Sequence, residues 1–116
     1  MIETNFGWIR INGETFEYDI VIHTDGSITR RNRKGSKKLK GIYGHTPLTS
    51  DELEFLREER PEVVYVGTGQ NGALPITPDA EEILADYRAV IGTTPEIIPE
   101  IKVETRKYSA IIHVTC

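Results

Sequence analysis

The stretch VVYVGTGQNGALPITP, residues 63–78, decides the fold class, because a strand, a glycine-rich loop and a helix start follow one another in it. Residues 63–66 are apolar and β-branched or aromatic, which is typical of a strand buried on both faces. Three glycines then spell G-x-G-x-x-G. Thr77 followed by Pro78 is typical of a helix start, with the threonine as N-cap and proline at the first helical position. The stretch therefore predicts a strand–loop–helix unit.

The residues after this stretch repeat the same alternation. A helix beginning at Thr77 has an apolar stripe, and "AVIG" (89–92) predicts a second buried strand. Thr94 and Pro95 predict a second capped helix, in which Pro99 removes a backbone hydrogen bond and should kink the helix or delay its first turn. "SAIIHV" (109–114) predicts a last strand. Strands alternating with helices indicate βαβ units and a largely parallel sheet. The helix stripe consists of Ala80, Ile83, Leu84 and Tyr87.

A further helix is expected just before the quoted stretch. Thr49 with Glu52 three residues later has the pattern of a capping box, and Leu48 and Leu53 have the spacing of a hydrophobic staple. This helix should end before Pro61, because the residue preceding a proline disfavours helical backbone.

The first half of the chain predicts antiparallel strands. "WIRING" (8–13), "TFEYDIVIHT" (15–24) and "SITR" (27–30) alternate apolar and polar residues or are rich in β-branched ones. "NG" at 12–13 and "DG" at 25–26 are hairpin signals between them. We expect a small single α/β domain spanning residues 1–116, with N-terminal antiparallel strands joined to a βαβαβ mixed sheet in layers.

Composition excludes several classes of protein. The 116 residues are 38% hydrophobic and 28% charged, as in ordinary globular domains, and no apolar run is long enough to cross a membrane. The first residues, MIETNFGWIR, lack the pattern of a secretory signal. Cys116 is the single cysteine, so no intrachain disulfide forms. These features favour the cytoplasm.

Charge is distributed unevenly along the chain. The stretch RRNRKGSKKLK (30–40) holds seven basic residues and no acid, whereas the rest of the chain has seven basic and eighteen acidic residues. This basic segment begins a link of about 18 residues, longer than most structureless loops. It is a solvated loop or a contact surface for an anionic partner. The candidate contacts are Arg30, Arg31, Arg33, Lys34, Lys37, Lys38 and Lys40.

The glycine motif does not have the context of a dinucleotide site. In such sites the helix opens within the glycine turn, so that its N–H groups meet the pyrophosphate. Here Ala73 to Ile76 intervene, and Asp86 lies in a helical pattern instead of at a strand end. No Gly-Lys-Ser or Gly-Lys-Thr follows, which excludes a P-loop. We therefore expect no nucleotide site, and no cofactor of any kind.

Three C-terminal motifs occur together in one known family. "GTGQNG" (67–72), "TTPE" (93–96) and "HVTC" (113–116), with the pattern from Phe6 to Asp19 and the basic segment before "YG" (43–44), resemble the Mth 938-like family, also called domain of unknown function 498. The resemblance covers nearly the whole chain and implies a small α/β domain with a layered mixed sheet. Relatives include an adipogenesis-associated protein and a mitochondrial complex I assembly factor. Pro99 departs from the family pattern, in which the last helix is regular.

If the C-terminal strands are parallel, the loops after them meet at one edge of the sheet. Open α/β sheets usually bind ligands at this edge. The alternative is that the loops only satisfy each other's backbone groups. The candidate ligand-binding residues are Gly67, Thr68, Gly69, Gln70, Asn71, Thr94 and His113.

No catalytic or metal site is predicted. His113 and Cys116 are three residues apart, so on a strand their side chains tend to face opposite sides. A packed histidine and an inert terminal thiol are expected instead. Together with His23 and His45, they show no metal-ligand spacing.

We therefore expect a non-catalytic domain that acts by protein association, as the assembly-factor relative suggests. The alternative is a small-molecule-binding protein or enzyme with a site at the carboxyl edge. Nucleic-acid binding through residues 30–40 is the weaker alternative, because the segment lacks aromatic residues for stacking and the chain has a net charge of −4. Hydrophobic edge strands would allow a homodimer.

Overall fold

The computed structural model describes all 116 residues, and its strands form two sheets. The smaller sheet is antiparallel and holds β1 (Ile2–Asn5), β2 (Trp8–Ile11) and β3 (Glu14–Phe16). The larger sheet has the order β5-β4-β8-β6-β7. Its strands are β4 (Ile20–Ile22), β5 (Ile28–Arg30), β6 (Val63–Thr68), β7 (Arg88–Gly92) and β8 (Tyr108–His113). β6 pairs in parallel with β7 and β8, and β4 joins β8 antiparallel, so the predicted mixed sheet is confirmed.

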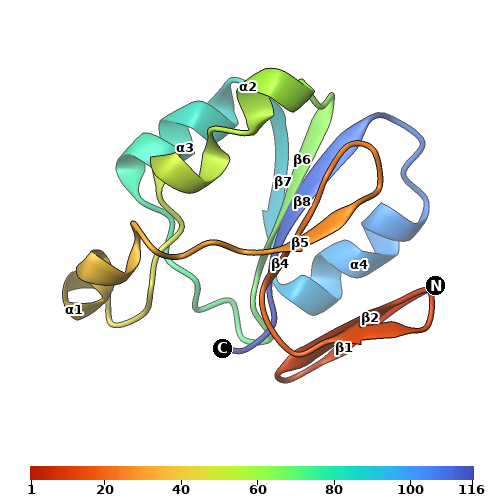
Figure 1. Cartoon of the computed structure of the whole chain (residues 1–116), viewed down its shortest axis with the longest axis horizontal. Helices are drawn as coiled ribbons and strands as arrows, with labels where there is room; N and C mark the ends of the chain where they lie inside the picture. The colour runs from red at the N-terminus through yellow and green to blue at the C-terminus, as the bar shows by residue number, and fades with distance from the viewer.

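Helices cover both faces of the larger sheet. α2 (Leu56–Glu59) and α3 (Pro78–Ala85) lie on one face, and α4 (Thr94–Lys102) and the smaller sheet lie on the other (Figure 1). The long basic link contains a 3₁₀ turn (Lys37–Leu39) and α1 (Lys40–Tyr43), and another 3₁₀ turn (Ser50–Leu53) precedes α2. α1 projects away from the layers at one end of the molecule (Figure 1). No helix has the length and apolarity needed to span a membrane.

The two faces of the larger sheet bury separate hydrophobic clusters, because side chains alternate along each strand. Val63 and Tyr65 of β6 pack toward α4, whereas Val64 and Val66 pack toward α2 and α3. Every residue of β6 is buried. This explains why β6 reads as a continuous apolar run instead of an alternating one.

The N-terminal half contains five short strands instead of the three predicted. The expected strand over 15–24 is broken after Phe16 and resumes at Ile20, so that β3 and β4 belong to different sheets. The predicted Asn12–Gly13 hairpin turn is confirmed, since both residues have positive φ angles, 49° and 87°.

Of the three predicted helix N-caps, one is confirmed and two need correction. The Thr77 side chain caps α3 by accepting the Ala80 N–H. Thr93, not Thr94, caps α4 and forms a capping box with Glu96. The capping box predicted at Thr49 is wrong, because its hydroxyl makes no cap bond and lies instead 2.7 Å from the Ser36 hydroxyl.

Two further predictions about the C-terminal half need correction. β7 is not a buried strand but the edge of the larger sheet, and its Ile91 side chain is 49% exposed. Strand order places it there, and strand order cannot be read from local apolarity. Pro99 does not delay the first turn of α4, which runs unbroken through it to Lys102.

Candidate functional site

The loops after β6, β7 and β8 meet at the carboxyl edge of the larger sheet. The Gln70 N–H donates to the Thr115 carbonyl (2.7 Å), and the Asn71 N–H donates to the carbonyl of Cys116 (3.0 Å). The Thr94 N–H donates to a carbonyl of the first loop, that of Gly69 (3.0 Å). The three loops are therefore bonded directly to one another.

The threonine side chains at this edge are used for internal hydrogen bonds. Thr94 is fully buried, and its hydroxyl accepts the Gly69 N–H (3.0 Å) and donates to the His113 carbonyl (2.6 Å). The Thr68 hydroxyl donates to the Gly92 carbonyl (3.0 Å). Neither hydroxyl has its hydrogen left for a ligand.

Two glycines of the motif permit close packing of the loops. A Cβ atom on Gly67 would lie 2.7 Å from the Thr94 hydroxyl oxygen. Gly69 has a φ of +102°, and a Cβ atom there would lie 2.4 Å from the Cys116 carbonyl carbon and 2.7 Å from the His113 ring. All three distances are shorter than real Cβ contacts, so the edge is closely filled around the two glycines.

The remaining polar candidates of the loop differ from each other. The Gln70 amide donates to the Thr4 hydroxyl (3.0 Å) and so joins the loop to the smaller sheet. Asn71 is exposed, and its side chain makes no hydrogen bond within the protein. Ligand binding by these two residues stays a prediction, while the observed side-chain hydrogen bond of Gln70 is with a protein group.

His113 is packed and oriented by a carboxylate from a distant part of the chain. Its Nδ1 lies 2.8 Å from Asp19 Oδ2, and its Nε2 lies 3.3 Å from the Thr115 hydroxyl. The Val114 N–H donates to the other oxygen of Asp19 (2.9 Å). No spacing rule could have found this pair, because 94 residues separate its members.

Arg31 is the centre of a buried ion network and is therefore absent from the contact surface predicted for the basic segment. Its side chain is 1% exposed. One terminal nitrogen donates to Asp19 (3.0 Å), and the fork donates twice to Glu52 (2.6 and 2.9 Å). It also donates to the Pro47 carbonyl (2.9 Å). This arginine holds the start of the basic segment against the domain.

Ionisation of the network is stabilised from both sides. Burial by itself would lower the pKa of Arg31, but the hydrogen bond to Glu52 and the charges of Glu52 and Asp19 together raise it. Burial would raise the pKa of Asp19, but the hydrogen bond and charge of His113, the Val114 amide and Arg31 together lower it. The buried charges therefore remain paired around neutral pH.

Ser36 is a second anchor of the basic segment. It is fully buried, and its hydroxyl donates to Glu52 (2.7 Å), the carboxylate that also binds Arg31. The Arg31 N–H donates to the Asp19 carbonyl (2.8 Å). Residues 32–35 are consequently a loop held at both ends by buried groups.

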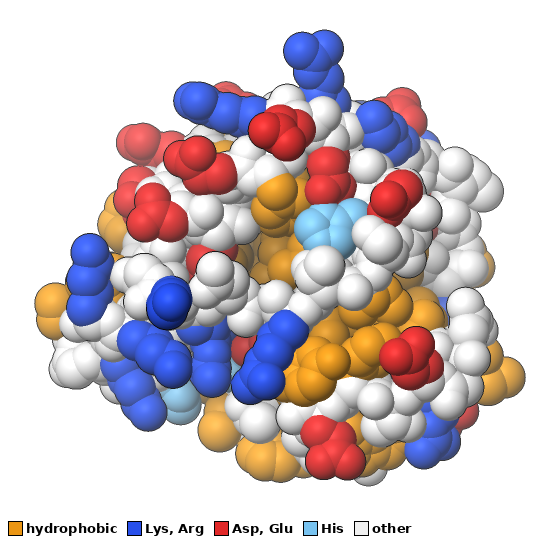
Figure 2. Space-filling view, in the orientation of Figure 1, with side chains coloured by type: hydrophobic (Ala, Val, Ile, Leu, Met, Phe, Trp, Pro, Cys, Tyr) orange, Lys and Arg blue, Asp and Glu red, His pale blue; other side chains and the backbone are white.

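The other six basic residues of the segment form what we call the cationic surface. None of them makes an ion pair within the protein, since every ion pair in the molecule involves other cations. The Arg30 guanidinium lies over the Tyr18 ring, 4.8 Å from its centroid. Figure 2 shows Lys and Arg side chains gathered over this part of the molecule. The members are Arg30, Arg33, Lys34, Lys37, Lys38 and Lys40.

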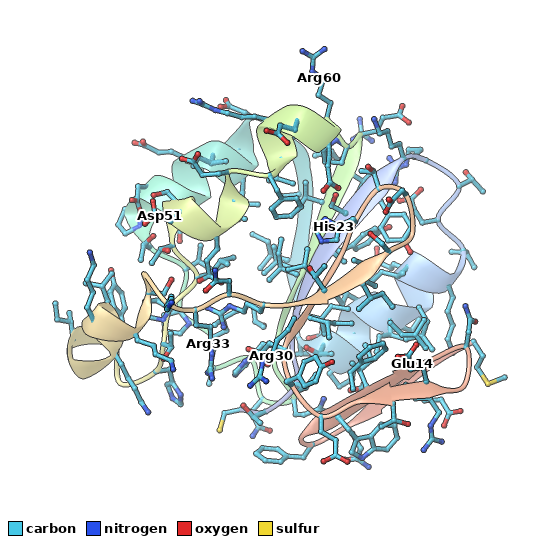
Figure 3. All side chains as sticks on the ribbon, in the orientation of Figure 1. Glu14, His23, Arg30, Arg33, Asp51 and Arg60 are labelled. Carbon is cyan, nitrogen blue, oxygen red and sulfur yellow. The ribbon has the colours of Figure 1, made fainter.

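A cavity of about 310 Å³ lies beside the basic segment, and its hydrophobic lining residues are Val21, Phe55 and Ile111. His23 stands in its wall (Figure 3), with Nδ1 2.6 Å from Glu59 Oε2 and Nε2 2.7 Å from the Thr29 hydroxyl. These contacts fix the imidazole and join the β4–β5 hairpin to the end of α2. Sequence reasoning missed this cluster because Glu59 is 36 residues from His23. No three His, Cys, Asp or Glu side chains come together as a metal site.

Comparisons with known proteins find relatives of known structure that match this chain over its full length. No protein-family model and no curated protein matches it. It is similar to the conserved hypothetical protein PH1505 from Pyrococcus horikoshii OT3, with 33% identity over 100% of this chain and 99% of that one and a TM-score of 0.85. It is also similar to the protein MT938, with 34% identity, a TM-score of 0.80 and 98% of that chain covered. A protein from Bordetella parapertussis, at 18% identity, 95% and 90% coverage and a TM-score of 0.57, shares the fold. The chain therefore belongs to the Mth 938-like family.

Proposed function

We propose that this domain is a non-catalytic association module that binds an acidic protein partner through its cationic surface. The observation that carries the proposal is that six neighbouring cations have no ion-pair partner in the protein. The loop that contains two of them is held at both ends by the buried anchors Arg31 and Ser36. An ordered patch of one sign steers and orients an oppositely charged partner.

The contrast with the carboxyl edge supports association over small-molecule chemistry. At that edge the hydroxyls of Thr68 and Thr94 and the amide of Gln70 are bonded to protein groups. A ligand would first have to displace these contacts. The cationic surface requires no internal ion pair to be broken, because its six cations make none.

Native mass spectrometry of the protein enriched gently from its own cells tests the proposal. The expected species is the domain bound to an acidic protein. In a variant with Lys34, Lys37, Lys38 and Lys40 all changed to glutamine, this complex should be lost, because a surface that has lost its charges no longer attracts the partner.

A matched control removes four unpaired cations elsewhere, by changing Arg57, Arg88, Lys102 and Lys107 to glutamine. The net charge of this control changes by the same amount as that of the four-lysine variant, yet its complex with the partner should persist. A bare subunit or a plain homodimer in the unmodified protein contradicts the proposal. Loss of the complex in both variants also contradicts it, because binding would then depend on net charge alone. A small molecule bound at the carboxyl edge would support the alternative site instead.

A further inference from the structure

The cationic surface contains a hollow of about 370 Å³ with no acidic side chain in its lining. Arg31 is one of the lining residues, but its side chain is bound to Asp19 and Glu52. The lining residues, which define the cationic hollow, are Arg30, Arg31, Asn32, Arg33, Lys34 and Lys37. Two arginines and two lysines among them have no ion-pair partner.

Two of the side chains around the cationic hollow, Arg30 and Asn32, are held in place before any ligand arrives. Arg30 is stacked on Tyr18. The Asn32 side-chain oxygen accepts the Lys34 N–H (3.1 Å), which leaves the amide NH₂ of Asn32 as a donor. Arg30 and Arg33 point toward the same side of the molecule (Figure 3). Binding therefore orders fewer side chains than it would on a mobile loop.

A neighbouring hollow of about 160 Å³ shares Arg30, Arg31 and Arg33 but fits an anion less well. Its lining includes the acidic residues Glu17 and Asp19. Asp19 is paired with Arg31, but Glu17 is exposed and makes no ion pair, so its charge opposes an anion there. The cationic hollow is the better site because it lacks such a group.

We propose that the cationic hollow binds a phosphoryl group, as a phosphate monoester. A phosphoryl dianion brings about two negative charges and three acceptor oxygens, whereas a carboxylate brings one charge and two oxygens. Guanidinium groups bind phosphate through paired hydrogen bonds, and lysines add point charges. Four unpaired cations and an amide donor around one hollow match the dianion better than a single carboxylate. The volume also exceeds that of one phosphoryl group, so the esterified group has room.

This inference deepens the proposed function, on which it rests, by assigning the partner's acidic segment a phosphorylated residue. Arginine clusters of this kind recognise phosphorylated motifs in other proteins. The same chemistry could come from a free phosphate ester, so the test includes both sources.

The test is a nuclear magnetic resonance titration of the whole protein at constant ionic strength, following the arginine Nε–H signals. The probes are inorganic phosphate, the peptide Glu-Glu-phosphoserine-Glu-Glu and the same peptide with glutamate at the centre. We expect the phosphopeptide to bind about tenfold more tightly than its counterpart and to shift the Arg30 and Arg33 signals. Its affinity should fall as the pH drops through the second phosphate pKa of about 6, while the affinity of the glutamate peptide stays nearly constant.

Two variants separate the hollow from general electrostatics. Arg33→Gln removes a cation that lines it, and Lys38→Gln removes one of equal charge from the same segment outside it. Arg33→Gln should weaken phosphopeptide binding about tenfold and Lys38→Gln about twofold or less. Equal losses in the two variants overturn the inference.

The remaining outcomes distinguish the two proposals. Equal binding of both peptides overturns the phosphoryl site but supports an acidic partner. Binding of neither peptide overturns the site and weakens the proposed function with it. Inorganic phosphate that binds as tightly as the phosphopeptide supports the site and assigns it to small phosphate esters.

Discussion

The carboxyl edge of the larger sheet and the basic segment both carry many polar side chains but use them in opposite ways. At the edge, the hydroxyls of Thr68 and Thr94 and the ring of His113 are bonded to other protein groups. In the basic segment, Arg31 and Ser36 are bonded in this way, but the other six cations make no ion pair. A conspicuous motif thus marks a closely packed junction, while a less specific charge run supplies the free groups. The difference teaches that a candidate recognition surface is identified by the polar groups that the fold leaves without internal partners.

The largest expected effect on stability comes from Arg31, the one cation of the basic segment that is buried. Arg31→Met leaves the carboxylates of Asp19 and Glu52 buried without their counter-ion, which should cost about 3–5 kcal/mol of unfolding free energy. Arg30→Met, one residue away on the exposed side, should cost about 1 kcal/mol or less, the worth of its contact with Tyr18. Urea unfolding of both variants measures the two values. Equal losses would show that Arg31 is no anchor.

The packing of the carboxyl edge can be tested by adding one methyl group. Gly69→Ala places a side chain on a residue with φ of +102° and against Cys116 and His113. Gly26→Ala is the matched control, because Gly26 has a φ of +88° with nothing within 4 Å of its Cβ position. The control should cost about 1–2 kcal/mol for the left-handed backbone alone.

Gly69→Ala should cost about 1–3 kcal/mol more than this control, because its methyl group overpacks the junction. Thermal or urea unfolding of the two variants gives the difference directly. If both variants lose the same stability, the edge has space for a methyl group at residue 69, and the close packing described above is wrong. A ligand site would then be the better explanation for the polar residues of these loops.

The buried network also predicts a pH dependence, centred on Asp19. Its folded-state pKa lies below the ordinary value of 3.8, so its contribution is present at neutral pH and is lost as the pH falls through the folded pKa. At pH 7, Asp19→Asn should be less stable than the unmodified protein by about 1–3 kcal/mol, the worth of hydrogen bonds to a charged group. The gap should narrow between about pH 5 and about pH 2. Urea unfolding across this range checks the sign, and a gap that widens toward acid contradicts it.

Local patterns predicted the parts of the fold that depend on neighbouring residues. Thr77 caps its helix because the threonine, the proline after it and the N–H that it accepts lie within four residues. The apolar run of β6 predicts a strand buried on both faces, and its helical crossovers predict parallel pairing. These signals need no knowledge of the rest of the chain.

Sequence-based predictions failed where a residue distant in the sequence bound a side chain that was expected to have a local partner. Glu52 has the spacing of a capping-box partner for Thr49, but Arg31 and Ser36 bind its carboxylate instead. The candidate surface failed at Arg31 for the same reason, since a charge run does not show which member finds buried partners. The partner of His113 at Asp19 and that of His23 at Glu59 are set by strand and helix packing, which the sequence does not display.

The smallest expected effect on stability completes the comparison between the two regions. Changing Lys34, Lys37, Lys38 and Lys40 to glutamine removes four charges that make no ion pair, so the unfolding free energy should change by no more than about 0.5 kcal/mol. Urea unfolding measures this change, and the set of Arg57, Arg88, Lys102 and Lys107 changed to glutamine is its control for net charge. A loss above about 1 kcal/mol would mean that the lysines stabilise the fold. If stability changes negligibly while the partner complex is lost, the four lysines bind the partner without stabilising the fold. Arg31 and Ser36 would then be the residues that hold the basic segment in place.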